Sequence, residues 1–196
     1  MFYKARDKSS SFFSYSVCRR LGDFQAQEDV LHRCSSLPSC TYDHFLVMAQ
    51  QASDGKSSNM SVARAAYLVC LARILESPSP DYKALAQIVR KLIRLVDSFD
   101  KSGNEVLDLY IRAEEIVRGL QAGVYLKEEA QWLVSTAWNR GVMHSNFDEY
   151  DQAERWMEIA ISLRKHAPGM ESSEALMTNV LKQVRLDKQR EGSCVE

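Results

Sequence analysis

The chain has 196 residues, a formal net charge of −1 at pH 7, 45% hydrophobic and 26% charged residues. A soluble chain of this size can bury a sizeable core, as one domain or a short array. The small net charge gives no overall attraction to nucleic acid or to an anionic membrane. The longest strongly apolar run, residues 65–72, is far too short to span a bilayer, so we expect no membrane partner.

The N-terminal region and the cysteines favour a cytosolic or nuclear protein. The first ten residues lack the apolar core of a signal peptide. The five cysteines are odd in number and show no spacing typical of a disulfide scaffold. We therefore expect reduced thiols.

The first third of the chain contains a weak helical-hairpin signal and one clear loop. Leu21-Gly22-Asp23-Phe24 resembles the turn and the start of the second helix in a helical repeat. The sequence SDGKSSN predicts a loop over residues 53–59. Residues 61–76 are apolar on almost every side, which indicates a helix sandwiched between neighbours.

Two amphipathic helices are predicted next. From Leu85 onward, apolar residues recur with the spacing of one helix face, and we expect Ser79 to cap this helix with Pro80 in its first turn. The helix that follows Gly103 is expected to close at Gly123. The outer side of the first helix carries basic residues that we treat as a candidate partner-binding stripe: Lys83, Arg90, Lys91 and Arg94.

Residues 127–168 carry the most specific hairpin signal. A hairpin whose two helices touch needs small side chains where they cross and bulky ones beside them. The small positions are Gly141, Ala153 and Ala160, and the bulky ones are Trp138, Tyr150 and Met157. Compared with the usual TPR pattern, Met157 occupies a position where an aromatic residue is usual, and Pro168 lies slightly farther along the chain than expected. We expect the second helix to begin near Asp148, which can cap it.

Together with a C-terminal helix and tail at 171–196, these elements predict an all-α protein. We expect a right-handed α-solenoid of TPR-like helical hairpins, with about nine helices, that runs through residues 1–196 as a single array. Solenoids bind other proteins along an extended surface and seldom carry out chemistry.

Three patterns suggest other functions. His32, Cys34, Cys40 and His44 raise the question of zinc, but residues two apart on a helix point to different faces. Gly55-Lys56-Ser57 looks like the end of a phosphate loop but lacks the earlier glycine and the preceding strand. The basic stripe could hold an acidic peptide or a DNA backbone; because the rest of the chain is not basic, we do not expect direct DNA binding.

Two side chains of the 127–168 hairpin lie outside its main apolar stripe, and each has two interpretations. Trp132 and Met143 can pack on a neighbouring hairpin or anchor a partner. No serine, histidine and aspartate set, no cysteine and histidine set and no pair of carboxylates stands out. We therefore expect no enzyme, no cofactor and no small-molecule substrate.

The segment from Trp132 to Leu163, WLVSTAWNRGVMHSNFDEYDQAERWMEIAISL, is similar to the signature segment of the sporulation-specific protein 22-like family of meiotic TPR-like proteins, the testis-expressed protein 11 type. The match is most specific at Trp132-Leu133, at Ala137-Trp138-Asn139 and around the turn before Ala153. Family members are several-fold longer, so the resemblance covers a C-terminal portion. Trp138, Gly141, Tyr150 and Ala153 match as packing positions.

The resemblance implies a non-enzymatic scaffold on meiotic chromosomes in the nucleus. Such proteins promote crossover formation and synapsis by holding meiotic recombination and synaptonemal-complex proteins. The alternative is a general TPR-like adaptor that binds acidic peptides outside meiosis, through the basic stripe together with Asn139 and Arg140. A metal-dependent enzyme built on the histidine and cysteine group is the remaining alternative.

Overall fold

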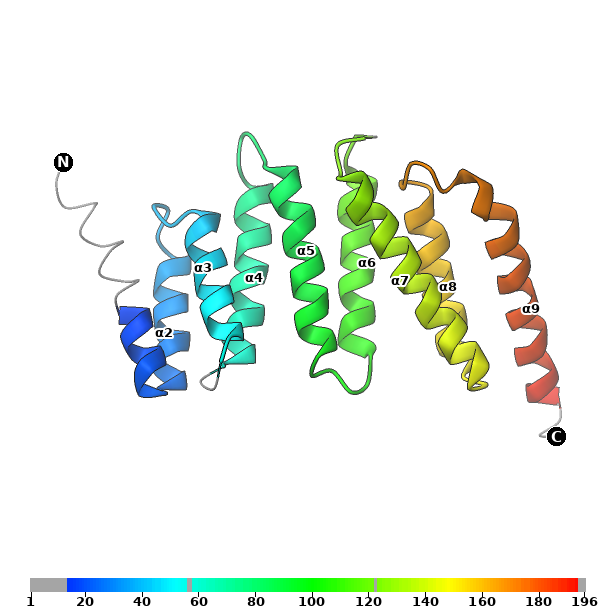
Figure 1. Cartoon of the computed structure of the whole chain (residues 1–196), viewed down its shortest axis with the longest axis horizontal. Coiled ribbons are helices and arrows are strands. Elements are labelled where there is room, and N and C mark those ends of the chain that lie inside the picture. The colour runs from blue at the N-terminus through cyan, green and yellow to red at the C-terminus, as the bar shows by residue number, and fades with distance from the viewer. Residues whose placement is uncertain (1–13, 56–57, 122, 194–196) are drawn as a thin grey trace. The chain divides into compact units, whose positions relative to one another are not determined.

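The computed structural model describes residues 14–55, 58–121 and 123–193, and every regular element in these residues is helical (Figure 1). The predicted all-α class is therefore confirmed for them. Lys56 and Ser57 of the predicted loop and Cys194 lie outside the described residues. The helices are residues 14–21, α2 (Phe24–Ser35), α3 (Tyr42–Ser53), α4 (Met60–Leu75), α5 (Tyr82–Asp97), α6 (Asn104–Gly119), α7 (Lys127–Asn146), α8 (Tyr150–Arg164), the short 3-10 helix η1 (Glu171–Ser173) and α9 (Glu174–Ser193).

The chain divides into two compact units, Met1–Phe99 and Asp100–Glu196. Each unit has its own set of packed helices. A single array through both units stays a prediction.

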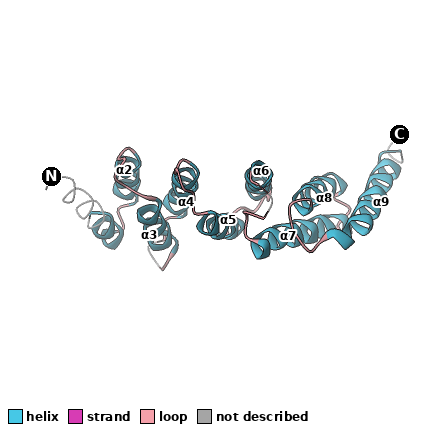
Figure 2. Ribbon diagram, turned by 90° about the horizontal axis from the view of Figure 1, so that it is seen from above, coloured by secondary structure: helices cyan, strands magenta, loops and turns pink. Residues whose placement is uncertain are grey.

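In the first unit, α3 and α4 form the most closely packed pair, and α4 also contacts α2 and α5. Seen from above, α2 and α4 lie in one layer and α3 lies in the other (Figure 2). The pair can approach closely because both helices present alanines that are fully buried: Ala49, Ala52, Ala63 and Ala66. The burial of α4 on several sides follows from its nearly uniform apolar sequence.

In the second unit, α7 and α8 form the most closely packed pair, and α8 also contacts α6 and α9. Here α6 and α8 lie in one layer, with α7 in the other (Figure 2). The same rule therefore holds inside each unit: the second helix of a hairpin touches its partner, the helix before that partner and the helix that follows. Each hairpin buries its apolar surface against its neighbours in sequence.

Short polar residues fix where the helices begin. The Asp23 side chain accepts a hydrogen bond from the backbone N–H of Ala26 at 2.9 Å, and Asn59 caps α4 through Val62 at 3.2 Å. Such caps satisfy backbone donors that have no partner inside the helix.

Three boundaries differ from the sequence-based expectation. Asp81, and not Ser79, caps α5, because its carboxylate accepts from the N–H of Ala84 at 2.9 Å, so Pro80 lies outside the helix. Asp148 has a φ of 58° and belongs to the turn, so α8 begins after Glu149. Helix α6 ends at Gly119, four residues before the expected Gly123.

Candidate functional site

The α7–α8 hairpin crosses at Gly141. A Cβ atom placed on this glycine would lie 2.6 Å from the Cγ atom of Met157 and 3.2 Å from both the backbone oxygen of Ala153 and the backbone nitrogen of Met157. Real Cβ atoms do not approach other atoms that closely, so the Met157 side chain would have to shift, and the backbone of α8 would be crowded as well. The structure thus brings together three of the residues that the sequence analysis assigned to the crossing.

The other residues assigned to this hairpin surround the same contact. Trp138 and Tyr150 are half-buried and pack against the core cluster that contains Ala153 and Met157. Ala160 is fully buried one turn farther along α8. The hydroxyl of Tyr150 donates to the Asp148 carboxylate at 2.8 Å. The cluster also receives Leu181 and Val184 from α9, residues that the sequence analysis did not connect to the hairpin.

Three aromatic rings link α6 to the hairpin, a contact that the sequence analysis missed. The ring of Tyr110 stacks on Trp132 at 6.4 Å and meets Trp156 edge-on at 5.1 Å. The Tyr110 hydroxyl lies 2.5 Å from the hydroxyl of Thr136 on α7. Trp132 is therefore a packing residue within this unit, the first of its two predicted interpretations. Periodicity could have indicated Trp156, which follows Ala153 by three residues and precedes Ala160 by four.

The polar residues of α7 are partly used inside the unit. The guanidinium of Arg140 lies 5.1 Å from the ring centre of Trp156, a cation–π contact. Arg140, half-buried, is therefore engaged in packing rather than simply presented to a peptide. Met143 in the last turn of α7 and Phe147, the residue that follows the helix, are 46% and 71% exposed. They are exposed apolar side chains beside the turn of the hairpin.

Helix α9 is held on α8 by a set of ion pairs. Arg185 contacts Glu154 at 2.6 Å and Glu158 at 2.5 Å. Lys188 contacts Asp151 at 2.6 Å and also reaches Glu154 at 2.9 Å. Hydrogen bonds from the two cations hold the pKa of Glu154 below its ordinary value, Lys188 being the largest cause. The same contacts raise the pKa of Lys188.

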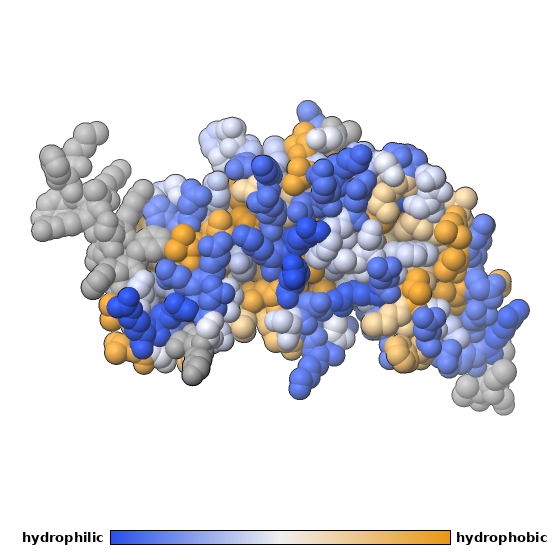
Figure 3. Space-filling view, in the orientation of Figure 1, coloured by the Kyte–Doolittle hydropathy of each residue, from blue (hydrophilic) through white to orange (hydrophobic). Residues whose placement is uncertain are grey.

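The predicted basic stripe lies on α5 in the first unit. Lys83, Lys91 and Arg94 are exposed, whereas Arg90 is half-buried. No carboxylate occurs on α5 between Asp81 at its start and Asp97 at its end. From Lys83 to Arg94 the stripe extends about 16 Å along the helix axis. Strongly hydrophilic side chains lie over α5 in the space-filling view (Figure 3).

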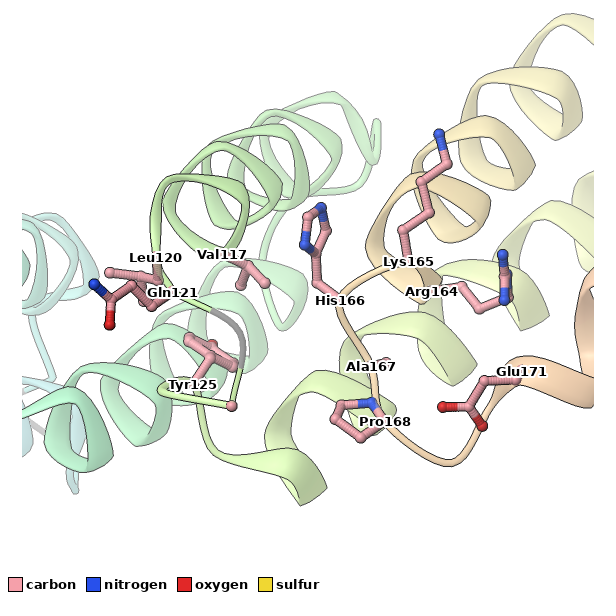
Figure 4. Close-up of a pocket in the computed structure, with 11 residues that line it drawn as sticks. Val117, Leu120, Gln121, Tyr125, Arg164, Lys165, His166, Ala167, Pro168 and Glu171 are labelled. Carbon is pink, nitrogen blue, oxygen red and sulfur yellow. The ribbon is translucent and has the colours of Figure 1, made fainter.

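A cavity of about 370 Å³ lies in the second unit, between the end of α6 and the segment after α8. Val117, Leu120 and Tyr125 stand on one side of it, and the loop of residues 166–168 stands on the other (Figure 4). The ends of the Arg164 and Lys165 side chains point away from this space (Figure 4). Arg164, which is buried, pairs with Glu174 at 2.9 Å. The cavity therefore has mixed walls, because Gln121, His166 and Glu171 line it together with the apolar side chains.

The histidines and cysteines considered for zinc have different environments. Cys34 and Cys40 are buried and His32 is exposed, while His44 accepts from the Thr41 backbone N–H at 3.1 Å as part of a capping box. Within the described residues, no group of three potential ligands is close enough to hold a metal ion. Burial raises the pKa of the Cys70 thiol to about 12, so this cysteine is a poor nucleophile near neutral pH.

A comparison of the sequence with models of known protein families found no family that matches it. Within the residues that the structure describes, no helix combines the length and the apolar character needed to cross a membrane.

Proposed function

We propose that this chain is a non-enzymatic protein-interaction scaffold that acts on meiotic chromosomes, where it supports crossover formation and synapsis. In this proposal its helices form a right-handed solenoid of TPR-like hairpins. The observation that carries the proposal is the contact of Gly141 with Ala153 and Met157. These residues lie inside the segment that resembles the sporulation-specific protein 22-like family.

The packing inside each unit supports a repeat architecture. In a solenoid each hairpin contacts only its neighbours, and its apolar faces are covered by the helices before and after it. Helix α8 meets this description because it contacts α6, α7 and α9, and α4 meets it because it contacts α2, α3 and α5. Helix faces that are not used in such packing are available to protein partners.

The meiotic setting is supported by the resemblance of residues 132–163, which matches the hairpin at its packing positions. We propose the nucleus as its location and recombination and synaptonemal-complex proteins as its partners. The helix packing supports a scaffold, and the resemblance supports the meiotic setting.

The test is affinity capture with the full chain from meiotic germ cells, read by mass spectrometry. Two variants accompany the wild type: Gly141→Leu, which opens the crossing, and Gly119→Leu, whose added side chain meets no atom within 4 Å of the Cβ position. Recovery of meiotic recombination or synaptonemal-complex proteins by the wild type and Gly119→Leu, but not by Gly141→Leu, supports the proposal. Recovery of chaperones or of unrelated proteins alone overturns it.

A second candidate function is an adaptor that binds acidic peptides on α5. The observation that favours it is the exposure of Lys83, Lys91 and Arg94 on a helix that has no carboxylate between its ends. Reversing two charges, Lys91→Glu with Arg94→Glu, should abolish the affinity for a fluorescent peptide rich in aspartate and glutamate. Equal binding of this double variant contradicts the adaptor. Tighter binding of duplex DNA than of the peptide, with a steep dependence on salt, would assign the stripe to DNA instead.

A further inference from the structure

The connection between α4 and α5 contains two consecutive serine–proline pairs, Ser77-Pro78 and Ser79-Pro80. They account for two of the four prolines in the chain. A proline ring fixes its own φ and keeps the preceding residue out of the helical region. Accordingly, residues 76–81 form no regular element between Leu75 and Tyr82. A serine in such a segment can enter an enzyme cleft without unfolding a helix.

The structure distinguishes the two serines. Ser77 is half-buried, and its hydroxyl donates to the backbone oxygen of Ser79 at 3.2 Å and accepts from the Ser79 N–H at 3.3 Å. Ser79 is exposed, and within the described part of the chain its own hydroxyl makes no hydrogen bond. The Ser77 hydroxyl is thus engaged in holding the turn, while the Ser79 hydroxyl is presented to solvent directly before Pro80.

We propose that Ser79 is a phosphorylation site for a proline-directed kinase, the class of protein kinase that requires proline immediately after the target serine. In the reaction the Ser79 Oγ atom forms a bond to the γ-phosphorus of ATP. The bond from that phosphorus to the bridging β,γ-oxygen breaks, ADP leaves, and the hydroxyl proton passes to the base of the kinase. Its exposure and its unengaged hydroxyl select Ser79 over Ser77, the other serine of the connection, which also precedes a proline.

The position of Ser79 gives this modification a local effect. A phosphate adds a charge of about −1.5 to −2 at pH 7. Ser79 lies two residues before Asp81, which caps α5, so the new charge stands at the helix end that favours anions. It also stands at the Lys83 end of the basic stripe. If α5 binds acidic peptides, the second candidate function, phosphorylation of Ser79 reduces that binding.

The experiment treats the full chain with Mg²⁺, ATP and a purified proline-directed kinase, once with a cyclin-dependent kinase and once with a mitogen-activated protein kinase. Mass spectrometry then locates the phosphate. We expect phosphate on Ser79 with at least one kinase, at no less than about ten times the initial rate at Ser77. Pro80→Ala should abolish modification of Ser79, whereas Pro78→Ala should leave it unchanged. Ser61, which is exposed but is followed by Val62, is the internal control and should remain unmodified.

Three results overturn the proposal. They are the absence of phosphate on Ser79 while a standard serine–proline peptide is fully modified, an undiminished rate in Pro80→Ala, and a rate at Ser77 equal to that at Ser79. A thermal melt of Pro80→Ala confirms that the variant is folded. Because Pro80 precedes the helix cap, its replacement removes no helical hydrogen bond.

A separate titration tests whether phosphorylation changes peptide binding by α5, independently of whether Ser79 is a kinase substrate. The acidic fluorescent peptide is added to the phosphorylated and the unphosphorylated chain, with Ser79→Ala treated in the same way. Weaker binding after phosphorylation supports the regulatory effect. If no form binds the peptide, the adaptor function and its regulation fail together, while the mass spectrum still decides whether Ser79 is modified.

Discussion

Two helix pairs use the same turn but differ in the residues at the position where their helices cross. One is the α7–α8 hairpin, and the other is formed by residues 14–21 and α2. Each turn contains one residue with positive φ, Asp148 at 58° and Gly22 at 68°. In both, the next residue donates its N–H five positions back at 3.0 Å. The positive-φ residue itself donates three positions back, at 3.2 Å for Asp148 and 3.1 Å for Gly22. These two hydrogen bonds define a Schellman motif, which ends a helix and redirects the chain.

Counting from the positive-φ residue aligns the two pairs. Seven positions before it stand Gly141 in one pair and Tyr15 in the other, and five positions after it stand Ala153 and Gln27. All four residues are buried. Neither amide atom of Gln27, nor the hydroxyl of Tyr15, finds a hydrogen-bond partner in the described part of the chain. Burial raises the pKa of Tyr15 to about 12.

The difference shows that the turn and the crossing are set by separate residues. A glycine and an alanine allow close approach in the second unit, while two long polar side chains occupy the equivalent positions in the first. A buried polar atom without a partner costs stability, whereas a tight apolar contact adds to it. The two pairs should therefore respond to substitution with opposite signs.

The largest effect is expected at Gly141. Gly141→Leu places a side chain where Met157 and Ala153 already stand, and we expect it to lower the free energy of unfolding by about 3 kcal/mol. Gly119→Leu, also on a helix, should change it by less than about 0.5 kcal/mol because a Cβ atom at this exposed position meets no atom within 4 Å. Urea unfolding of both variants gives the difference. Equal values for the two variants would show that the α7–α8 crossing is loose.

A change of opposite sign in the free energy of unfolding is expected at Gln27. Gln27→Met keeps the side-chain length and the helix propensity and removes two buried polar atoms that find no partner among the described residues. We expect the free energy of unfolding to rise by about 1 kcal/mol, the lower part of the cost of an unsatisfied group. Gln25→Met, on the exposed side of the same helix, is the control. A loss of stability in Gln27→Met would mean that the amide is hydrogen-bonded in solution.

The third prediction concerns how much the contact of Tyr110 with α7 contributes to stability. Tyr110→Phe keeps both ring contacts but removes the hydroxyl that meets Thr136, so we expect a loss of about 1 kcal/mol by chemical unfolding. The matched change Tyr150→Phe removes a hydroxyl bonded to Asp148 at an exposed turn and should have almost no effect. A larger loss of stability in Tyr110→Phe than in Tyr150→Phe supports a contribution of the Tyr110–Thr136 hydrogen bond, and equal losses contradict it.

The smallest effect is expected from lowering the pH, which weakens the ion pairs between α8 and α9. The pKa of Glu154 in the folded chain lies below its ordinary value of 4.5 because Lys188 and Arg185 bond to its carboxylate. A lowered pKa stabilises the folded state above the ordinary pKa, and this stability is lost as the pH falls through the folded value. Below about pH 4.5 the wild type should therefore lose about 0.5–1 kcal/mol, allowing for solvent screening.

Glu154→Gln, already neutral, should lack this loss, whereas Glu115→Gln at an exposed position of α6 should keep it. Thermal melts at pH 7 and pH 3.5 provide the measurement. An identical acid response in all three proteins would show that the ion pairs do not hold α9 in place.

The sequence predicted the parts of the fold that depend on local patterns. Apolar spacing predicted α5 through α8, and the small residues around Gly141 predicted which part of α7 meets α8. It did not predict the cap at Asp81, because Ser79 and Asp81 are both good capping residues and the apolar spacing of the helix does not distinguish them.

Contacts between helices distant in sequence were the least predictable. The stacking of Tyr110 on Trp132 and the ion pairs of Arg185 depend on how α6 and α9 are placed on the hairpin, which no spacing within one helix reveals. The basic stripe was visible as charge, yet only the structure shows that Arg90 is half-buried while Lys83, Lys91 and Arg94 are exposed.

The α7–α8 hairpin is closed by direct contact of Gly141 and Met157. The most direct test is a double-mutant cycle of Gly141→Ala and Met157→Ala, followed by urea unfolding. A Cβ at position 141 would lie 2.6 Å from the Met157 Cγ, an atom that Met157→Ala removes. We expect the double variant to be more stable, by at least about 1 kcal/mol, than the sum of the two single changes would give. Strict additivity would contradict it, because residues that do not touch cannot relieve each other.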